Sequence, residues 1–168
     1  RLISIQQGGA TRILSWRESA GLNLMTSLLF SASGALNITA ARSVVEMRSA
    51  LAPDIARLAA LRGGSATADA LDLLATQMRD ARGDLGQVQT LALAWWGQLA
   101  SGSGNVAYRL AYNTLRESYQ QFQGLLTQVL AEEYRDVSLY AALSEAVRRA
   151  DPEDAEQIAR DIIKRGEG

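Results

Sequence analysis

The sequence contains no histidine and no cysteine among its 168 residues. The absence of cysteine excludes a disulfide-linked scaffold and a metal site built from thiolates. Because the commonest general base and the commonest strong nucleophile are both missing, any catalysis would depend on carboxylates, lysine, tyrosine or serine. Most of those residues fall on the polar faces of predicted amphipathic helices, so we expect a protein that is not an enzyme.

The sequence also lacks a charge excess and a long apolar run. Lys and Arg number 17 against 18 Asp and Glu, which leaves a net charge of −1 with the two signs interleaved. A domain that itself binds nucleic acid needs a basic face, and the sequence shows none. No apolar run approaches the roughly 20 residues of a membrane helix, and no signal peptide precedes the first residues. We therefore expect a cytoplasmic protein without membrane contact.

Apolar residues recur at helical spacing through nearly the whole chain after its first 14 residues. Hydrophobic residues make up 48% of the chain, enough for one domain with a buried core. We predict an all-α fold, an antiparallel bundle of six or seven helices. Pro53 should kink the helix that contains it, and Asp151 followed by Pro152 predicts the start of the last helix. Other predicted ranges are 39–62, 105–129 and 132–149, the first two with Thr39 and Asn105 as N-caps.

The opening segment "RLISIQQGGATRIL" has a different pattern. Two short runs rich in Leu, Ile and Thr flank residues 6–9, where glycine tolerates a positive φ. This pattern predicts a short β-hairpin ahead of the bundle. Because an isolated two-stranded hairpin is at best marginally stable in water, it either packs on the following helices or belongs with elements outside this chain.

Three segments resemble parts of one known domain, in the same order along the chain. They are "VVEMRSALAPDIARLAALRG" (44–63), "WWGQLASGSGN" (95–105) and "LYAALSEAVRRADPEDAEQIARDII" (139–163). The domain is the effector-binding, or FCD, domain of FadR-type regulators in the GntR family. The segments are similar to its first long helix, its central Ser-Gly-Asn segment and its last two helices. The likeness covers nearly the whole chain and implies an FCD-like bundle with a regulatory role.

The opening hairpin is similar to the end of the wing in the N-terminal winged helix-turn-helix of GntR-family proteins. Leu2, Ile3 and Gly8 lie in register with that pattern. The resemblance implies two parts: residues 1–14 as a remnant of the DNA-binding domain, and residues 15–168 as the helical effector-binding and dimerisation domain. Operator DNA would be bound through the missing N-terminal domain, since the recognition helix is not in this chain.

Many FCD domains bind a divalent metal through an Asp and a His at i and i+4 and two further histidines. The corresponding positions in this sequence are Ala92, Trp96, Tyr140 and Ile162. Only the phenol among them could bind a metal, and only after losing its proton near its ordinary pKa of about 10. We therefore predict no metal and no other cofactor, as in FadR-like members that sense acyl-CoA thioesters without a metal.

Three side chains of the implied cavity have two interpretations each. Arg48 matches the arginine of the family's E-x-R motif and would bind a carboxylate, phosphate or thioester oxygen, or it forms a structural salt bridge with Glu46 or a neighbouring helix. Trp96 is a cavity wall or ordinary core. Tyr140 hydrogen-bonds an effector, or its hydroxyl reaches the surface. The predicted effector-binding residues are Arg48, Ala92, Trp96, Tyr140 and Ile162.

The resemblance implies a ligand-responsive DNA-binding transcriptional regulator that works as a homodimer. A small organic effector, an acyl-CoA or an organic acid, would favour one arrangement of the dimer over another. The apolar stretch 22–30 is a candidate for the dimer contact or for packing under the wing. Two other classes stay open on the residues alone: a helical scaffolding domain without a ligand cavity, and a small all-α enzyme. A polar-lined cavity near Arg48, Trp96 and Tyr140 would favour the sensor, and a filled core the scaffold.

Overall fold

The structure, a computed structural model, describes residues 3–4, 12–13, 21–30, 35–121 and 123–166. The predicted all-α bundle is confirmed. In chain order the helices are η1 (Leu22–Leu24), α2 (Met25–Leu28), α3 (Ile38–Arg62), α4 (Gly64–Asp80), α5 (Leu85–Gly102), α6 (Val106–Gln121), α7 (Gln123–Val129), α8 (Ala131–Arg135), α9 (Ser138–Arg148) and α10 (Pro152–Arg165). Within these described ranges, none of the helices combines the length and the apolar character that crossing a bilayer requires.

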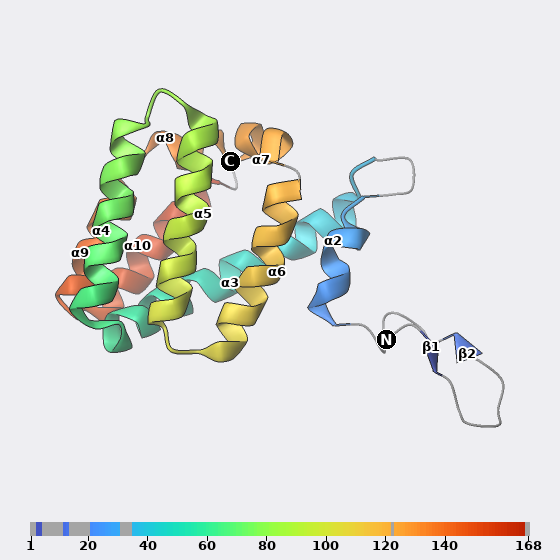
Figure 1. Ribbon diagram of the computed structural model, residues 1–168, viewed down its shortest axis with the longest axis horizontal. Coiled ribbons are helices and arrows are strands. Elements are labelled where there is room, and N and C mark those ends of the chain that lie inside the picture. The colour runs from blue at the N-terminus through green and yellow to red at the C-terminus, as the bar shows by residue number, and fades with distance from the viewer. Residues whose placement is uncertain (1–2, 5–11, 14–20, 31–34, 122, 167–168) are drawn as a thin grey trace.

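Five helices, α3, α4, α5, α9 and α10, make up the body of the bundle (Figure 1). α4 packs against both α5 and α9, and α3 packs along α10. α6 follows α5 and lies beside it, with η1 and α2 on its other side (Figure 1). The short helix α8 contacts both α5 and α10, so it joins the middle of the chain to its last helix.

Side-chain caps explain where several of these helices begin. Asp151 accepts a hydrogen bond from the Asp154 N–H at 3.1 Å. Asn105 accepts from the Tyr108 N–H at 3.3 Å, so both of these predicted N-caps are confirmed. The predicted cap at Thr39 is wrong, because the carboxamide of Asn37 accepts from the Ala40 N–H at 3.2 Å and α3 already includes Thr39.

Two predicted helices are each divided into two. The predicted range 105–129 holds α6 and α7, and the range 132–149 holds α8 and α9. At the second division, Asp136 has φ −104° and ψ 77°, outside the helical region. Its carboxylate accepts a hydrogen bond from the Ser138 N–H at 3.2 Å, and this capping of the next helix competes with continuation of the previous one. α3, by contrast, continues through Pro53 as one helix.

Two short strands lie near the start of the chain. β1 (Ile3–Ser4) pairs antiparallel with β2 (Arg12–Ile13), with Ile3 opposite Ile13. The turn predicted at residues 6–9 lies outside the described residues, so the complete hairpin stays a prediction. Both strands stand apart from the helical bundle in Figure 1.

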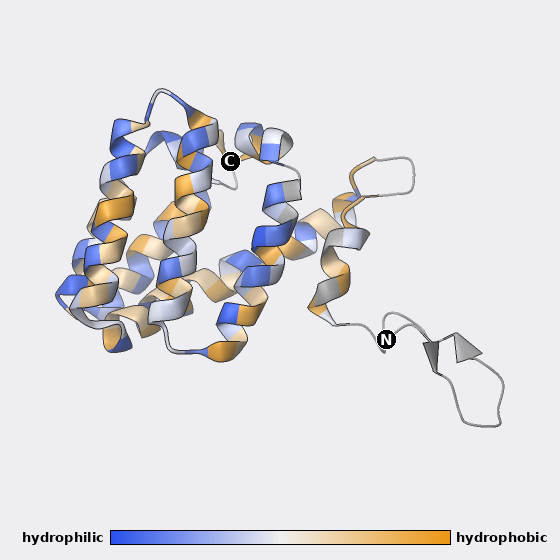
Figure 2. Cartoon of the chain, viewed as in Figure 1, coloured by the Kyte–Doolittle hydropathy of each residue, from blue (hydrophilic) through white to orange (hydrophobic). Residues whose placement is uncertain are grey.

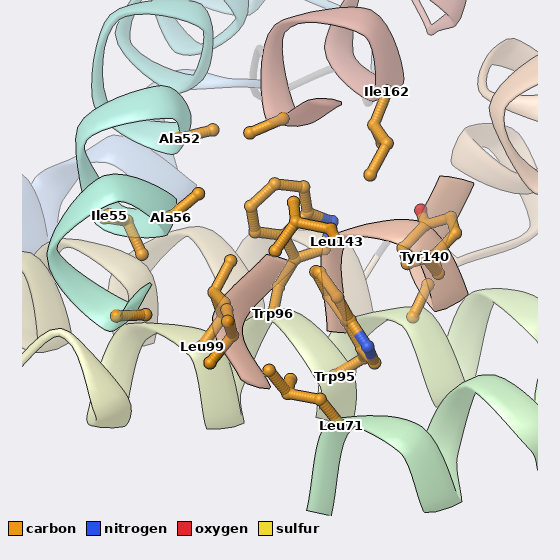
Figure 3. Packing of buried hydrophobic residues seen from close by; sticks show 14 of the residues in the cluster. Ala52, Ile55, Ala56, Leu71, Trp95, Trp96, Leu99, Tyr140, Leu143 and Ile162 are labelled. Atoms are coloured by element: carbon orange, nitrogen blue, oxygen red, sulfur yellow. The ribbon is translucent and has the colours of Figure 1, made fainter. Parts of the chain in front are cut away.

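Apolar side chains, most of them from the five helices of the bundle body and a few from α6 and α8, form one buried core, and the helices carry hydrophilic residues on their outer faces (Figure 2). Trp95 of α5 is fully buried in this core. Its ring meets Trp96 edge-to-face with centroids 5.3 Å apart, and meets Tyr140 in the same way at 5.0 Å (Figure 3). This aromatic cluster connects α5 to α9. Trp96 lies on the side of α5 that faces α3 (Figure 3).

Gly102→Ala is expected to destabilise the fold by about 1–3 kcal/mol, because it overpacks the contact between α4 and α5. A Cβ at position 102 would lie 2.5 Å from the Thr67 Cγ2. Thr67 is held in place because its hydroxyl donates to the Gly63 carbonyl at 2.7 Å. Chemical denaturation measures the change. The double variant Thr67→Ser/Gly102→Ala deletes the crowding methyl and should recover most of the loss, whereas an unaltered single variant would contradict the close contact.

Candidate functional site

A cavity of about 50 Å³ lies inside the bundle between α3, α5, α6 and α8. Its wall is mostly apolar or aromatic, with three charged side chains. The lining residues are Arg48, Leu51, Ala52, Ile55, Ala92, Leu93, Trp96, Tyr112, Leu115, Arg116, Tyr119, Glu133 and Tyr134. An apolar cavity with a few convergent polar groups is the usual form of a small-molecule site.

Arg48 and Glu133 form an ion pair at the edge of this cavity. The Arg48 Nη2 donates to both carboxylate oxygens of Glu133, at 2.6 Å and 2.5 Å. The two side chains are 13% and 1% exposed, so the pair is almost fully removed from water. Gly166, which follows α10, closes over the pair, because a Cβ there would lie 2.5 Å from the Glu133 Oε2. The pair therefore links α3, α8 and the end of α10.

Tyr140 completes this polar cluster. Its hydroxyl donates to the Glu133 Oε1 at 2.8 Å. Burial, together with the negative charge of Glu133, raises the pKa of Tyr140 well above its ordinary value. Burial opposes the charge on Arg48, but the charge of Glu133 and its hydrogen bond raise the pKa of Arg48 above its ordinary value. Arg48 is thus a fixed cation with a committed partner, and Tyr140 is a neutral donor.

The two adjacent tryptophans have different surroundings. The Trp95 indole N–H donates to the Ser144 hydroxyl at 3.3 Å inside the core. The Trp96 Nε1 is buried and has no hydrogen-bond partner among the described residues. Trp96 lines the cavity, so its side chain acts as a wall that carries an unused donor. Trp95 is a core residue, as its hydrogen bond and full burial indicate.

The structure brings three of the five predicted effector residues together. Arg48, Ala92 and Trp96 line the cavity. Tyr140 and Ile162 do not line it; both lie in the adjacent core, and Tyr140 reaches the cavity only through Glu133 (Figure 3). The interpretation in which the Tyr140 hydroxyl reaches the surface is wrong, because the residue is fully buried. Whether these residues bind an effector stays a prediction.

Sequence reasoning missed Glu133, Arg116 and Tyr119 as cavity residues. Arg48 has its salt bridge with Glu133 on a neighbouring helix, 85 positions away, and not with Glu46. The sequence contains only a weak indication that Glu133 is buried: Tyr134 follows it, and Leu130 precedes it at helical spacing. Nothing in the local pattern distinguishes Arg116 from a solvent-exposed helix residue.

The residues at the family's metal positions do not fit a divalent ion. Ala92 and Ile162 carry no ligand atom, and the Trp96 indole nitrogen is a donor only. Tyr140 keeps its proton because burial raises its pKa, and it donates that proton to Glu133 in a hydrogen bond. No group of three or more potential metal ligands occurs in the described part of the chain. A metal-free domain stays a prediction.

A second, apolar cavity of about 130 Å³ adjoins the first. Arg48 and Tyr119 line both cavities. Leu29 and Phe30, from the apolar stretch 22–30, also line the second cavity, so part of that stretch packs within the chain. The dimer contact suggested for the stretch stays a prediction.

A family model described as the FCD domain matches residues 43–165, the part of the chain that holds the first cavity. The chain belongs to the FCD domain family. It is 32% identical over 165 residues to an HTH-type transcriptional regulator of Mycobacterium bovis and to the HTH-type transcriptional regulator Mce2R of Mycobacterium tuberculosis. Each match covers 97% of this chain and 67% of the relative. The solved structure of Streptococcus agalactiae GntR has the same fold, with a TM-score of 0.66, 22% identity, and coverage of 98% of this chain and 73% of that chain.

The resemblance to FadR-type FCD domains is confirmed by these comparisons. Residues 43–165 form an FCD domain, the relatives of the chain are HTH-type transcriptional regulators, and an effector-binding role fits this domain. The family evidence points to a regulatory domain, which is not a class of enzyme. The assignment of residues 1–14 to a wing stays a prediction.

Alkaline pH is expected to destabilise this FCD domain because all five of its tyrosines have raised pKa values. Burial raises the pKa of Tyr112 to about 12. The unfolded chain releases that proton near pH 10, so the stabilisation is complete below about pH 10 and is lost toward pH 12. Its full size is about 3 kcal/mol for a shift of about two pH units.

Denaturant titrations at successive pH values, with tyrosinate absorbance and circular dichroism read together, test this expectation. Tyrosinate should appear as the helical signal disappears. The variant Tyr112→Phe should show a shallower fall in the free energy of unfolding above pH 10, although it also loses the bond that the Tyr112 hydroxyl donates to the Leu93 carbonyl. If the tyrosines ionised near their ordinary pKa while the helical signal stayed intact, the expected loss of stability at alkaline pH would be contradicted.

Proposed function

We propose that this FCD domain senses a small organic metabolite, an acyl-CoA or an organic acid, without a metal, and that it controls a DNA-binding domain preceding it. The cavity bordered by Arg48, Ala92 and Trp96 is the observation that carries the proposal. A scaffolding domain has no need of a buried cavity with charged groups in its wall, since each such group carries a desolvation penalty.

The proposal includes a homodimer that binds operator DNA in the cytoplasm. Residues 1–14 would end a winged-helix domain, and residues 15–168 would bind the effector and the second copy. The pairing of β1 with β2 apart from the helical bundle supports a hairpin that belongs with elements preceding it (Figure 1). Two-fold symmetry suits palindromic operators, because half-site spacing mirrors the symmetry of the protein. Gel filtration with light scattering tests the dimer, and a monomer at micromolar concentration would contradict it.

Thermal unfolding against a panel of acyl-CoA thioesters, organic acids and sugar acids tests effector binding. A ligand present at a hundred times its Kd and bound only to the folded state adds about 2.7 kcal/mol, or roughly 5–11 °C for a domain of this size. Divalent metals and EDTA serve as controls and should give no shift. The variant Ala92→Leu fills the cavity and should abolish the shift while retaining the helical signal. The proposal would be contradicted if no organic ligand in the panel raised the melting temperature.

A further inference from the structure

The charges that line the first cavity do not balance. Arg48, Arg116 and Glu133 are its three charged residues, from α3, α6 and α8. Glu133 is committed to Arg48 through two hydrogen bonds of 2.6 Å and 2.5 Å. Arg116 forms no ion pair with any carboxylate in the described ranges. Among the described residues, the cavity lining therefore carries one positive charge, that of Arg116, without an ion-pair partner.

The unused hydrogen-bonding atoms of the cavity wall are donors. The Arg116 Nε and the Trp96 Nε1 are both buried and lack a partner among the residues that the structure describes. The Tyr112 hydroxyl is not available, because it donates to the Leu93 carbonyl. Buried polar groups are nearly always paired, so two unpaired donors beside one cavity indicate an acceptor that occupies it. An acceptor that also carries a negative charge would satisfy the unpaired Arg116.

We propose that the effector is a compact monoanion, a small carboxylic acid whose carboxylate pairs with Arg116 and accepts a hydrogen bond from the Trp96 indole. This assignment rests on the proposed effector-binding function and narrows its ligand class. Arg48, the arginine of the family motif, is a positioning residue, because Glu133 already neutralises it. The apolar remainder of the ligand lies against Leu51, Ile55 and Ala92.

Size and charge exclude the larger candidates from this cavity. About 50 Å³ admits a few heavy atoms and does not admit a CoA moiety with its several phosphates. A second carboxylate would be buried with no cation left to pair with, which is strongly unfavourable. A monoacid is therefore preferred both to a CoA thioester and to a diacid of similar length.

The test compares propionate, its neutral isostere propionamide and the diacid succinate, with sodium chloride at equal ionic strength as the reference. Thermal unfolding and tryptophan fluorescence are measured for the whole chain. Propionate should raise the melting temperature and change the fluorescence, whereas propionamide and succinate should bind at least tenfold more weakly. Equal effects of propionate and propionamide, or no effect of propionate, would overturn the proposal.

Three variants locate the binding group. Arg116→Gln should weaken propionate binding at least tenfold, Arg116→Lys should retain part of it, and Trp96→Phe should weaken it about tenfold by deleting one donor to a charged acceptor. Arg82→Gln, an exposed site between α4 and α5, removes the same charge and should bind propionate unchanged. Propionate binding that survives Arg116→Gln would overturn the assignment.

The failure of this inference differs from the failure of the proposed function. If a neutral compound of the wider panel raises the melting temperature and Ala92→Leu abolishes that shift, the domain is a sensor and the monoanion assignment is wrong. If no organic compound binds at all, both are wrong.

Discussion

Replacing Glu133 by glutamine is expected to lower the free energy of unfolding by about 3–5 kcal/mol, because it breaks a buried ion pair from one side. The substitution keeps the shape of the side chain and removes its charge. Arg48, which is 13% exposed, would then keep its positive charge without a counterion. Loss of one partner from a buried ion pair is much more unfavourable than loss of an exposed pair, because the remaining charge cannot recover its hydration.

Chemical denaturation of Glu133→Gln and of a matched control measures this difference. In the control, Glu156→Gln breaks an exposed pair with Arg160 on α10, and it should change the free energy of unfolding by less than about 0.5 kcal/mol. The double variant Arg48→Met/Glu133→Leu removes both buried charges and should recover most of the loss. If Glu133→Gln and Glu156→Gln change the free energy of unfolding equally, the Arg48–Glu133 pair is not shielded from water.

Trp95→Ala is expected to cost about 3–5 kcal/mol, because it empties the centre of the core. The residue is fully buried, contacts Trp96 and Tyr140 with its ring, and donates to Ser144. The surrounding structure relaxes only in part after such a deletion, so a cavity remains. The unfolding transition, followed by circular dichroism, should move to a lower denaturant concentration with little change in slope.

Trp96→Ala is the matched comparison, since it removes the same side chain one position along α5. It should be less destabilising than Trp95→Ala by about 1–2 kcal/mol, because the cost of a deletion depends on how densely the site is packed. Trp96 already borders a cavity, and its N–H has no partner to lose in the described structure. Equal losses from the two variants would mean that Trp96 is packed as an ordinary core residue.

Most of the helices were predictable from local pattern. The caps at Asn105 and Asp151 and the spacing of apolar residues identify helix positions with interactions that span three or four residues. The division between α8 and α9 was missed because two arrangements compete at Asp136. In one, the helix continues through this residue; in the other, its carboxylate caps the next helix by accepting from the Ser138 N–H. Arg165 of α10 forms an ion pair with Asp136, so a distant helix favours the division.

The candidate site was predictable only in part. The likeness to the FCD domain placed Arg48, Ala92 and Trp96 at the cavity, and the structure has all three there. It also placed Tyr140 and Ile162 there, but neither residue lines the cavity, and both are buried in the core beside it. Glu133 and Arg116 were missed because their importance comes from their partners, or lack of partners, across the bundle.

The sequence by itself determined the helical class, the family and the absence of histidine and cysteine chemistry, because periodicity, caps and motifs are local properties of a chain. Only the tertiary structure decided that Arg48 is neutralised and that Arg116 has no carboxylate partner in the described part of the chain. Which charges meet depends on how α3, α6 and α8 pack together, and burial then makes each pairing worth far more than it would be in water.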